Sequence, residues 1–250
     1  MSAAAAPRRL VVNADDFGRS PGINRGVMAA HSDGIVTSAS LMVRWPAAAD
    51  AARWARTTPS LGLGLHLDLA EWVHDGSAWV AAYEVVPDDD PVAVADELWR
   101  QVERFDQLVG AVPTHVDSHQ HVHRSPGAHE AVAGVCAELG VPLRMEDPAI
   151  AHCGAFYGQT ATGEPLHEAV QPEALVALLE GLASGVTELL CHPGLSDESG
   201  SVYGPERDLE VAALCHPAVR RAVEDGGIEL VTFADLARPP SPGAAPALAG

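Results

Sequence analysis

The sequence predicts an α/β fold, an irregular, TIM-barrel-like (β/α) barrel with about seven parallel strands. Strand-like and helix-like segments alternate along most of the 250 residues, as expected for parallel strands joined by helical crossovers. Ionisable residues follow four of the predicted strands, at Asp15 and Asp16, at His66 and Asp68, at Asp117 and His119, and at His192. Because the chemistry of a barrel gathers at the carboxyl ends of several strands, these four places favour a barrel over a doubly wound sheet.

The first half of the chain supplies three strand–helix pairs. Residues 10–12 are an apolar run that predicts a buried strand, and residues 21–31 predict a helix that begins with a proline. A second strand at 35–43 is followed by an alanine-rich helix at 47–56. At 61–68, leucines at every second position predict a third strand, and residues 91–109 predict a longer helix.

The second half repeats this alternation. Strands are predicted to begin near Thr114, Val141 and Thr187, helices to cover 129–139 and 172–183, and a last strand to cover 228–232. No glycine-rich phosphate-binding fingerprint follows the first strand. We expect residues 1–238 to form a single domain and residues 239–250, mostly Pro, Ala and Gly, to be a disordered tail.

The net charge of −19 argues against nucleic acid or an anionic membrane surface as a partner, because both are polyanions. No stretch approaches the ~18 apolar residues of a membrane span, and the N-terminus lacks the order of segments that defines a signal peptide. The four cysteines are widely spaced and form no CxxC pair, which predicts reduced thiols and a cytoplasmic location: Cys136, Cys153, Cys191 and Cys215.

Two places near the first and third strands offer candidate ligands. Asp15 and Asp16 are adjacent, so their side chains point in different directions, and one can bind a metal while the other faces substrate. A turn with an N-cap explains the same residues. His66 lies within an apolar strand, where a core histidine is the alternative to a ligand, and Asp68 could accept a hydrogen bond from a histidine ring.

Residues 113–123 contain the densest group of ionisable side chains. Five of them occupy alternate positions: His115, Asp117, His119, His121 and His123. In an extended segment these side chains would share one face, and imidazole together with carboxylate suits zinc and similar ions. The pattern therefore predicts a metal site in this segment. His192, in a Pro-Gly turn after a predicted strand, could transfer protons or be structural.

In this order, the segments NADDFG, GLGLHLDL, PTHVDSHQHVH, LRM and ELLCHPG resemble the YdjC-like family of carbohydrate deacetylases. The resemblance extends from about residue 10 to about residue 232. It implies an irregular (β/α) barrel with one divalent ion held by an aspartate and two histidines. Matched onto this sequence, the metal ligands are Asp16, His66 and His119.

The same resemblance assigns three further roles. Asp15 corresponds to the catalytic base, His192 to the general acid, and Arg144 to a residue that orients Asp15. His121 or His123 could replace or supplement His119, and Gln120 stands where some relatives have a further histidine. Four aromatic residues could offer flat faces to a sugar, although burial in the core is the commoner fate: Trp45, Trp72, Trp79 and Tyr157.

The implied function is hydrolysis of the amide of an N-acetylated sugar, such as a chitooligosaccharide or a related glycoconjugate. The expected cofactor is one divalent ion, zinc first, with magnesium, manganese or cobalt as alternatives. Another metal-dependent barrel hydrolase, such as a phosphoesterase or a cyclic amidohydrolase, is the first alternative, and a non-enzymatic metal- or sugar-binding protein is the second. If the chain self-associates, a symmetric homodimer is the expected form.

Overall fold

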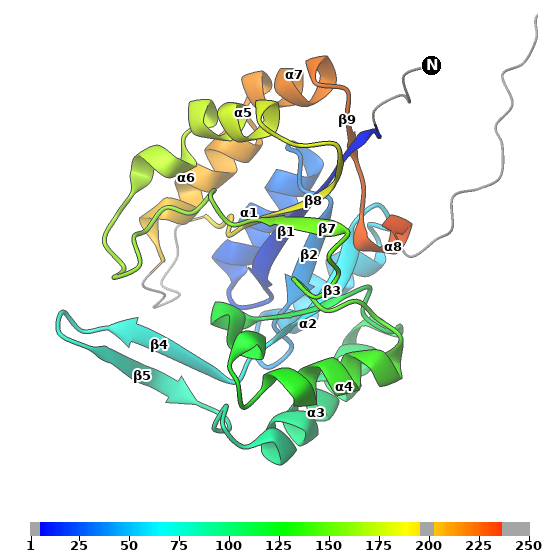
Figure 1. Cartoon of the computed structure of the whole chain (residues 1–250), viewed down its shortest axis with the longest axis vertical. Coiled ribbons are helices and arrows are strands. Elements are labelled where there is room, and N and C mark those ends of the chain that lie inside the picture. The colour runs from blue at the N-terminus through cyan, green and yellow to red at the C-terminus, as the bar shows by residue number, and fades with distance from the viewer. Residues whose placement is uncertain (1–5, 196–202, 237–250) are drawn as a thin grey trace, which may run out of the picture.

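Seven parallel strands form the central sheet of the computed structural model (Figure 1), which describes residues 6–195 and 203–236. The strands follow the order β6-β3-β2-β1-β8-β7, and β9 pairs with the first residues of β1. Their bounds are β1 Arg8–Phe17, β2 Ser38–Leu41, β3 Gly62–Leu67, β6 Val116–Ser118, β7 Ile150–Cys153, β8 Gly185–Cys191 and β9 Ile228–Leu230. The sheet curls into an irregular, incomplete barrel, which confirms the predicted fold class.

Helices cover the outside of the sheet, with α5, α6 and α7 at one end of the view in Figure 1 and α3 and α4 at the other. Their bounds are α1 Pro21–Ser32, α2 Ala48–Arg56, α3 Pro91–Val109, α4 His129–Leu139, α5 Pro172–Glu180, α6 Pro205–Leu214, α7 Pro217–Asp225 and α8 Phe233–Leu236. Two short 3₁₀ segments are η1 His119–Arg124 and η2 His167–Val170. Helices cover one face of the sheet and the barrel interior encloses the other, so most strand residues are buried, including polar ones such as Asn13, Ser38 and Glu188. None of the described helices is long and apolar enough to cross a membrane.

Local signals explain why the helix predictions agree closely with the structure. The Asp90 side chain accepts from the backbone N–H groups of Val92 and Ala93, and Pro91 follows it at the first helical position of α3. Gly110 ends the same helix in the left-handed region, with φ 77°. These start and stop signals place both ends of α3 where the sequence predicted them.

Two predicted strands are corrected by the structure. Residues 113–123 are extended only as far as Ser118, because Gln120 and His121 adopt left-handed conformations, with φ 50° and 53°, and turn the chain into η1. The strand expected near Val141 is a single parallel bridge between Leu143 and Val116, and the next strand, β7, begins only at Ile150. Pro142 and Pro148 lie between these points, and proline cannot donate to a ladder.

An antiparallel hairpin extends from the sheet and was not predicted (Figure 1). It consists of β4 Ala70–His74 and β5 Trp79–Glu84. Asp75 and Gly76 at its turn are a recognised hairpin signal. Helices α6 and α7 were also not predicted, although each begins with a proline. The tail predicted at 239–250 lies outside the described residues.

Candidate functional site

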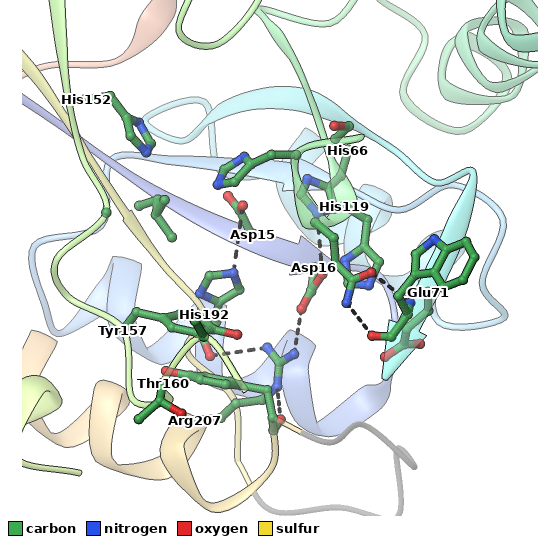
Figure 2. A pocket seen from close by; sticks show the side chains of 18 of the residues that line it. Asp15, Asp16, His66, Glu71, His119, His152, Tyr157, Thr160, His192 and Arg207 are labelled. Atoms are coloured by element: carbon green, nitrogen blue, oxygen red, sulfur yellow. Dashed lines mark hydrogen bonds and ion pairs between the residues drawn. The ribbon is translucent and has the colours of Figure 1, made fainter. Parts of the chain in front are cut away.

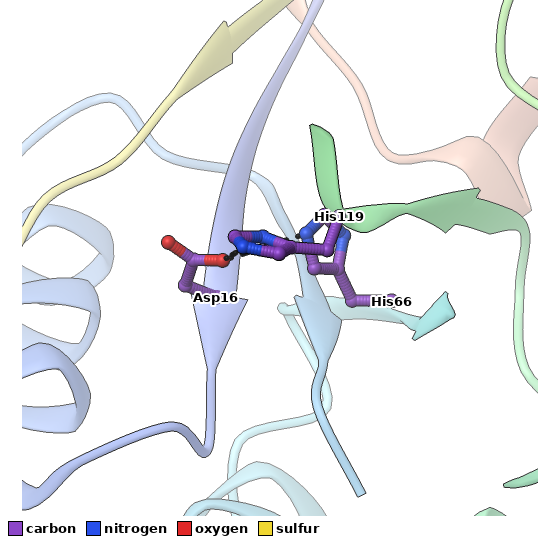
Figure 3. Close-up of side chains that lie close together, drawn as sticks. All are labelled: Asp16, His66 and His119. Carbon is purple, nitrogen blue, oxygen red and sulfur yellow. Dashed lines mark ion pairs between the residues drawn. The ribbon is translucent and has the colours of Figure 1, made fainter. Parts of the chain in front are cut away.

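Three side chains predicted as metal ligands lie together at the carboxyl ends of the strands (Figure 3). Asp16 lies near the end of β1, His66 near the end of β3, and His119 directly after β6. Asp16 Oδ1 is 3.5 Å from His66 Nε2 and 3.2 Å from His119 Nδ1. The potential ligand atoms all lie within 4.8 Å of one another, close enough for one ion to contact all three.

The environment of Asp16 shows that a cation fits between these side chains. Its Oδ1 is buried and has no hydrogen-bond partner in the described part of the chain, since neither imidazole approaches it with hydrogen-bond geometry. An unsatisfied buried carboxylate oxygen is costly unless a donor or a cation meets it. One carboxylate with two imidazoles is a donor set that zinc and related ions prefer.

Arg207, on α6, binds the other oxygen of Asp16, with Nη2 2.5 Å from Oδ2. Burial opposes ionisation of Asp16, but the charge of Arg207 and the contacts with His119 and His66 outweigh it and hold the Asp16 pKa well below its usual value. Asp16 is therefore ionised, with one oxygen held by Arg207 and the other facing the rings of His66 and His119. Arg207 was not predicted as a site residue, although a charged residue on the buried face of a helix could have indicated it.

His66 is held by a carboxylate on the neighbouring strand. Asp117 lies opposite it in the register between β3 and β6, and His66 Nδ1 is 2.7 Å from Asp117 Oδ1. A carboxylate at Nδ1 fixes the ring so that Nε2 faces the cation position, as is common for metal-binding histidines. The sequence left open whether Asp68 accepts from a histidine ring or is a loop carboxylate, and in the structure Asp68 accepts hydrogen bonds from Arg44, Trp45 and Tyr83.

Arg144 joins Asp15 to two other buried carboxylates. It binds Asp15 through two hydrogen bonds of 2.7 Å, and it lies 2.6 Å from both Asp117 Oδ2 and Glu188 Oε1. Although burial acts against ionisation, Arg144 contributes to lowering the pKa values of Asp15 and Glu188. Arg144 thus lies where the prediction placed it, beside Asp15. Glu188, a charged residue in an otherwise apolar strand, was missed.

A second group with ligand-like spacing consists of Asp15, His66 and Asp117. Both of its carboxylates already bind the guanidinium of Arg144. A cation in this group would have to compete with an internal positive charge. The arrangement of the described residues therefore favours one ion, at Asp16, over a two-ion centre.

His192 follows β8, the strand beside β1, and its ring lies next to Asp15, with 3.9 Å between Nε2 and Asp15 Oδ2 (Figure 2). Burial lowers the pKa of His192 to about 4, although Asp15 and Asp16 act in the other direction. The ring is therefore neutral near pH 7. Glu210 fixes the backbone here by accepting from the His192 N–H at 2.5 Å and from the Tyr203 hydroxyl.

The two other candidate histidines of η1 lie apart from the cluster of Asp16, His66 and His119 (the Asp16 group). His123 is buried and its Nδ1 is 2.6 Å from Ser118 Oγ, while the His121 ring packs edge-on against His152. Burial lowers the pKa of each to about 4. The left-handed turn at Gln120 and His121 directs them away from the face that an extended strand would have given them.

Asp15, Asp16, His66, His119 and His192 line one cavity of about 610 Å³, within the ~300–1,000 Å³ common for small-ligand sites (Figure 2). Its walls come from the strand ends, the β4–β5 hairpin, η1 and the segment between β7 and η2. Of the four aromatic candidates, Trp72, Trp79 and Tyr157 line the cavity. Trp45 does not, and it packs instead beneath Arg19.

Comparisons with known proteins agree with this architecture. The YdjC-like protein family matches residues 9–225. A carbohydrate deacetylase from Geobacillus stearothermophilus is 33% identical over 251 residues, covering 92% of this chain and 98% of the relative. A chitooligosaccharide deacetylase from Klebsiella pneumoniae is 35% identical over 250 residues, covering 92% and 99% respectively.

Solved structures support the same fold. A protein from Enterococcus faecalis V583, provisionally named a cellobiose-phosphate cleavage protein, is 25% identical and superposes with a TM-score of 0.77 over 93% of this chain and 100% of its own. A family 4 carbohydrate esterase from Streptomyces lividans, solved with acetate, has a TM-score of 0.54 at 13% identity, covering 90% and 93%. At that identity the second likeness concerns the fold alone.

Proposed function

Because this chain belongs to the YdjC-like family, we propose that it is a metal-dependent carbohydrate deacetylase that hydrolyses the acetamide of an N-acetylated sugar. The observation that carries the proposal is the unsatisfied Asp16 Oδ1, which faces two imidazoles in the cavity that also contains Asp15 and His192. Binding alone would require neither of the last two residues. Relatives that share most of the chain are named for the same reaction.

Asp16, His66 and His119 are the proposed ligands of one divalent ion, with zinc preferred over magnesium, manganese or cobalt because two donors are imidazoles. When bound, such an ion supplies a lowered pKa for water and polarisation of the acetyl carbonyl. Three protein ligands leave room for water and substrate, whereas a fourth would close the site.

Asp15 is the proposed base. It is ionised, and its two hydrogen bonds with Arg144 fix the carboxylate plane at the cavity wall. As water attacks the acetyl carbonyl, Asp15 accepts the proton that the water loses. Arg144 is a positioning residue in this scheme, because it acts through Asp15.

His192 is the proposed acid. A neutral imidazole must receive a proton before it can donate one, and the 3.9 Å between Nε2 and Asp15 Oδ2 is short enough for a small rotation or one water molecule to connect them. The proton taken by Asp15 then passes to His192 and on to the departing sugar nitrogen. The products are acetate and a free amine, and both residues return to their starting states.

Three further statements remain proposals from the sequence. The substrate is a chitooligosaccharide or related glycoconjugate, the chain forms a symmetric homodimer if it self-associates, and the spacing of its cysteines favours a cytoplasmic location. The alternative of a two-ion barrel hydrolase has less support, because Arg144 binds both carboxylates of the second ligand-like group.

The deciding experiment measures acetate released from N-acetylglucosamine and diacetylchitobiose by chelator-treated protein, with and without added zinc, manganese, cobalt or magnesium. We expect release only with metal and a stoichiometry of one ion per chain. Release that is unaffected by the chelator, or activity that requires two ions, would contradict the proposal.

A further inference from the structure

The β4–β5 hairpin presents two tryptophans on one face. In its register Trp72 lies opposite Ala81, and His74 lies opposite Trp79. Because side chains alternate along a strand and opposite residues share a face, Trp72, His74 and Trp79 project from the same side. Trp72 and Trp79 both line the cavity that contains the Asp16 group, so this is the side that faces the proposed catalytic residues.

The pairing of the hairpin shifts register between Glu71 and Trp72, at the place where β4 meets the cavity. Adjacent residues of a regular strand point in opposite directions, but here Glu71 and Trp72 both line the cavity. Glu71 pairs with Tyr83 and Trp72 with Ala81, so Ala82 is an extra residue on β5, and such a bulge bends the two-stranded ribbon. Glu71 is held in place by Arg19, with 2.6 Å between Nη2 and Oε2.

Gln120 fastens the hairpin to the segment that carries His119. Its side-chain amide pairs with the backbone of Trp72 in both directions, accepting from the N–H and donating to the carbonyl at 2.8 Å each. Gln120 keeps a left-handed conformation, with φ 50°, that is unfavourable for a residue other than glycine. The face of the hairpin that carries Trp72, His74 and Trp79 (the tryptophan face) therefore has a fixed position beside His119.

The exposure and charge of this face indicate what it binds. Trp72 is 41% exposed and Trp79 50% exposed, although both are large apolar side chains. A pyranose ring has C–H groups on its faces that pack against an indole, while its hydroxyl groups reach polar neighbours or water. Residues 70–84 contain three carboxylates and no lysine or arginine, which disfavours a phosphorylated sugar or an anionic lipid.

We propose that Trp72 and Trp79 form a subsite for a second, neutral sugar ring, next to the ring whose acetamide is hydrolysed. This rests on the proposed function and narrows it, since the preferred substrate becomes an uncharged oligosaccharide and a single N-acetylated sugar becomes a poor one. Trp79 supplies an outer surface, and Trp72 supplies a surface nearer His119.

The test compares diacetylchitobiose with N-acetylglucosamine in the metal-loaded wild type, Trp72→Ala, Trp79→Ala and Trp99→Ala. Trp99, on α3, is 36% exposed and does not line the cavity, which makes it the matched control. We expect Trp72→Ala and Trp79→Ala to raise KM for the disaccharide about tenfold, equivalent to about 1.4 kcal/mol, with kcat within about twofold. The kcat/KM for the monosaccharide should stay unchanged, and Trp99→Ala should match the wild type on both sugars.

Calorimetric titration of the same four proteins with diacetylchitobiose separates this inference from the proposed function. If no acetate is released from either sugar, binding that both cavity variants weaken and Trp99→Ala retains still supports the subsite. Equal losses on the two sugars, unchanged kinetics in both cavity variants, or no binding of diacetylchitobiose by the wild type would overturn it.

Discussion

His66 and Asp117 face each other across β3 and β6, with 2.7 Å between Nδ1 and Oδ1. The pairing leaves His66 Nε2 directed at Asp16. Asp117 also binds Arg144, so a single carboxylate links a proposed metal ligand to the residue that holds Asp15.

Replacing this carboxylate tests its effect on metal binding. In Asp117→Asn the amide cannot hold the His66 ring as the carboxylate does, and we expect metal affinity to fall ~10–100-fold. Competition with a fluorescent chelator measures the change. Asp68→Asn is the control, because Asp68 is equally buried and does not contact His66. Equal affinities of Asp117→Asn and the wild type would contradict the role.

Removing an imidazole tests the ligand set itself. His66→Ala should leave the protein without stoichiometric metal, since two remaining ligands bind a divalent ion weakly. His121→Ala should retain the metal, because His121 lies outside the Asp16 group. Metal content is measured by elemental analysis after gel filtration. Full occupancy in His66→Ala would refute the assignment of this ligand.

The proposed base can be separated from the metal ligands. Asp15→Asn removes a proton acceptor and leaves Asp16, His66 and His119 in place, so we expect normal metal content with kcat lowered ~10²–10⁴-fold. Acetate release and elemental analysis on the same preparation give both values. Turnover within a few-fold of the wild type would remove Asp15 as the base.

The Gln120 contact should control the mobility of the hairpin. Gln120→Asn keeps a residue that tolerates the left-handed conformation, but its shorter side chain cannot pair with Trp72. We expect faster amide hydrogen exchange at residues 70–84 and a raised KM for the disaccharide. Gln107→Asn, an exposed glutamine on α3, is the control. Unchanged exchange in the hairpin would show that Gln120 does not hold it.

His115 should make stability depend on pH. It is fully buried, stacks on Phe233, and burial lowers its pKa to about 4, although the charges of Asp117 and Glu188 act in the other direction. The unfolded chain takes up this proton near pH 6.5, so the stabilising contribution is complete above that value and is lost as the pH falls toward 4. The loss amounts to up to about 3 kcal/mol.

Urea unfolding at pH 7 and pH 5 measures this effect. His115→Phe keeps an aromatic ring on Phe233 without the titrating group, and we expect its free energy of unfolding to change less between the two pH values than that of the wild type. If both proteins lose the same amount, another group is responsible.

The parts of the fold that were predicted correctly carry their signals locally. Helix α3 was placed correctly because Asp90, Pro91 and Gly110 mark its ends. The β4–β5 hairpin was missed even though Asp75 and Gly76 mark its turn, because no core face accompanies it and most of β5 is exposed. The prediction for residues 113–123 was wrong after Ser118, because the alternation of ionisable side chains continues through the turn at Gln120 and His121, and no glycine marks that turn.

Part of the site was predictable because the carboxyl ends of parallel strands lie at the same edge of the sheet. Asp16, His66 and His119 come together for that reason, at the positions that the family resemblance suggested. The contact between His66 and Asp117 depends on the register of two strands about fifty residues apart, which periodicity does not define. Arg207 reaches Asp16 from a helix near the other end of the chain, and only tertiary structure shows that contact.

The strand order ends at β6 and β7, and among the described residues the outer edge of β6 meets a single backbone bridge, at Leu143. At this break Arg144 connects three strands through its side chain, to Asp15 on β1, Asp117 on β6 and Glu188 on β8. On this side of the sheet the strands are therefore joined by the ion pairs of one arginine, Arg144, and not by a continuous series of backbone hydrogen bonds. The peptide between Met145 and Ala149 is held by local contacts and by the 3.7 Å ion pair of Glu146 with His129 on α4, so a change in its length would bear on α4 before it reached the register of the strands.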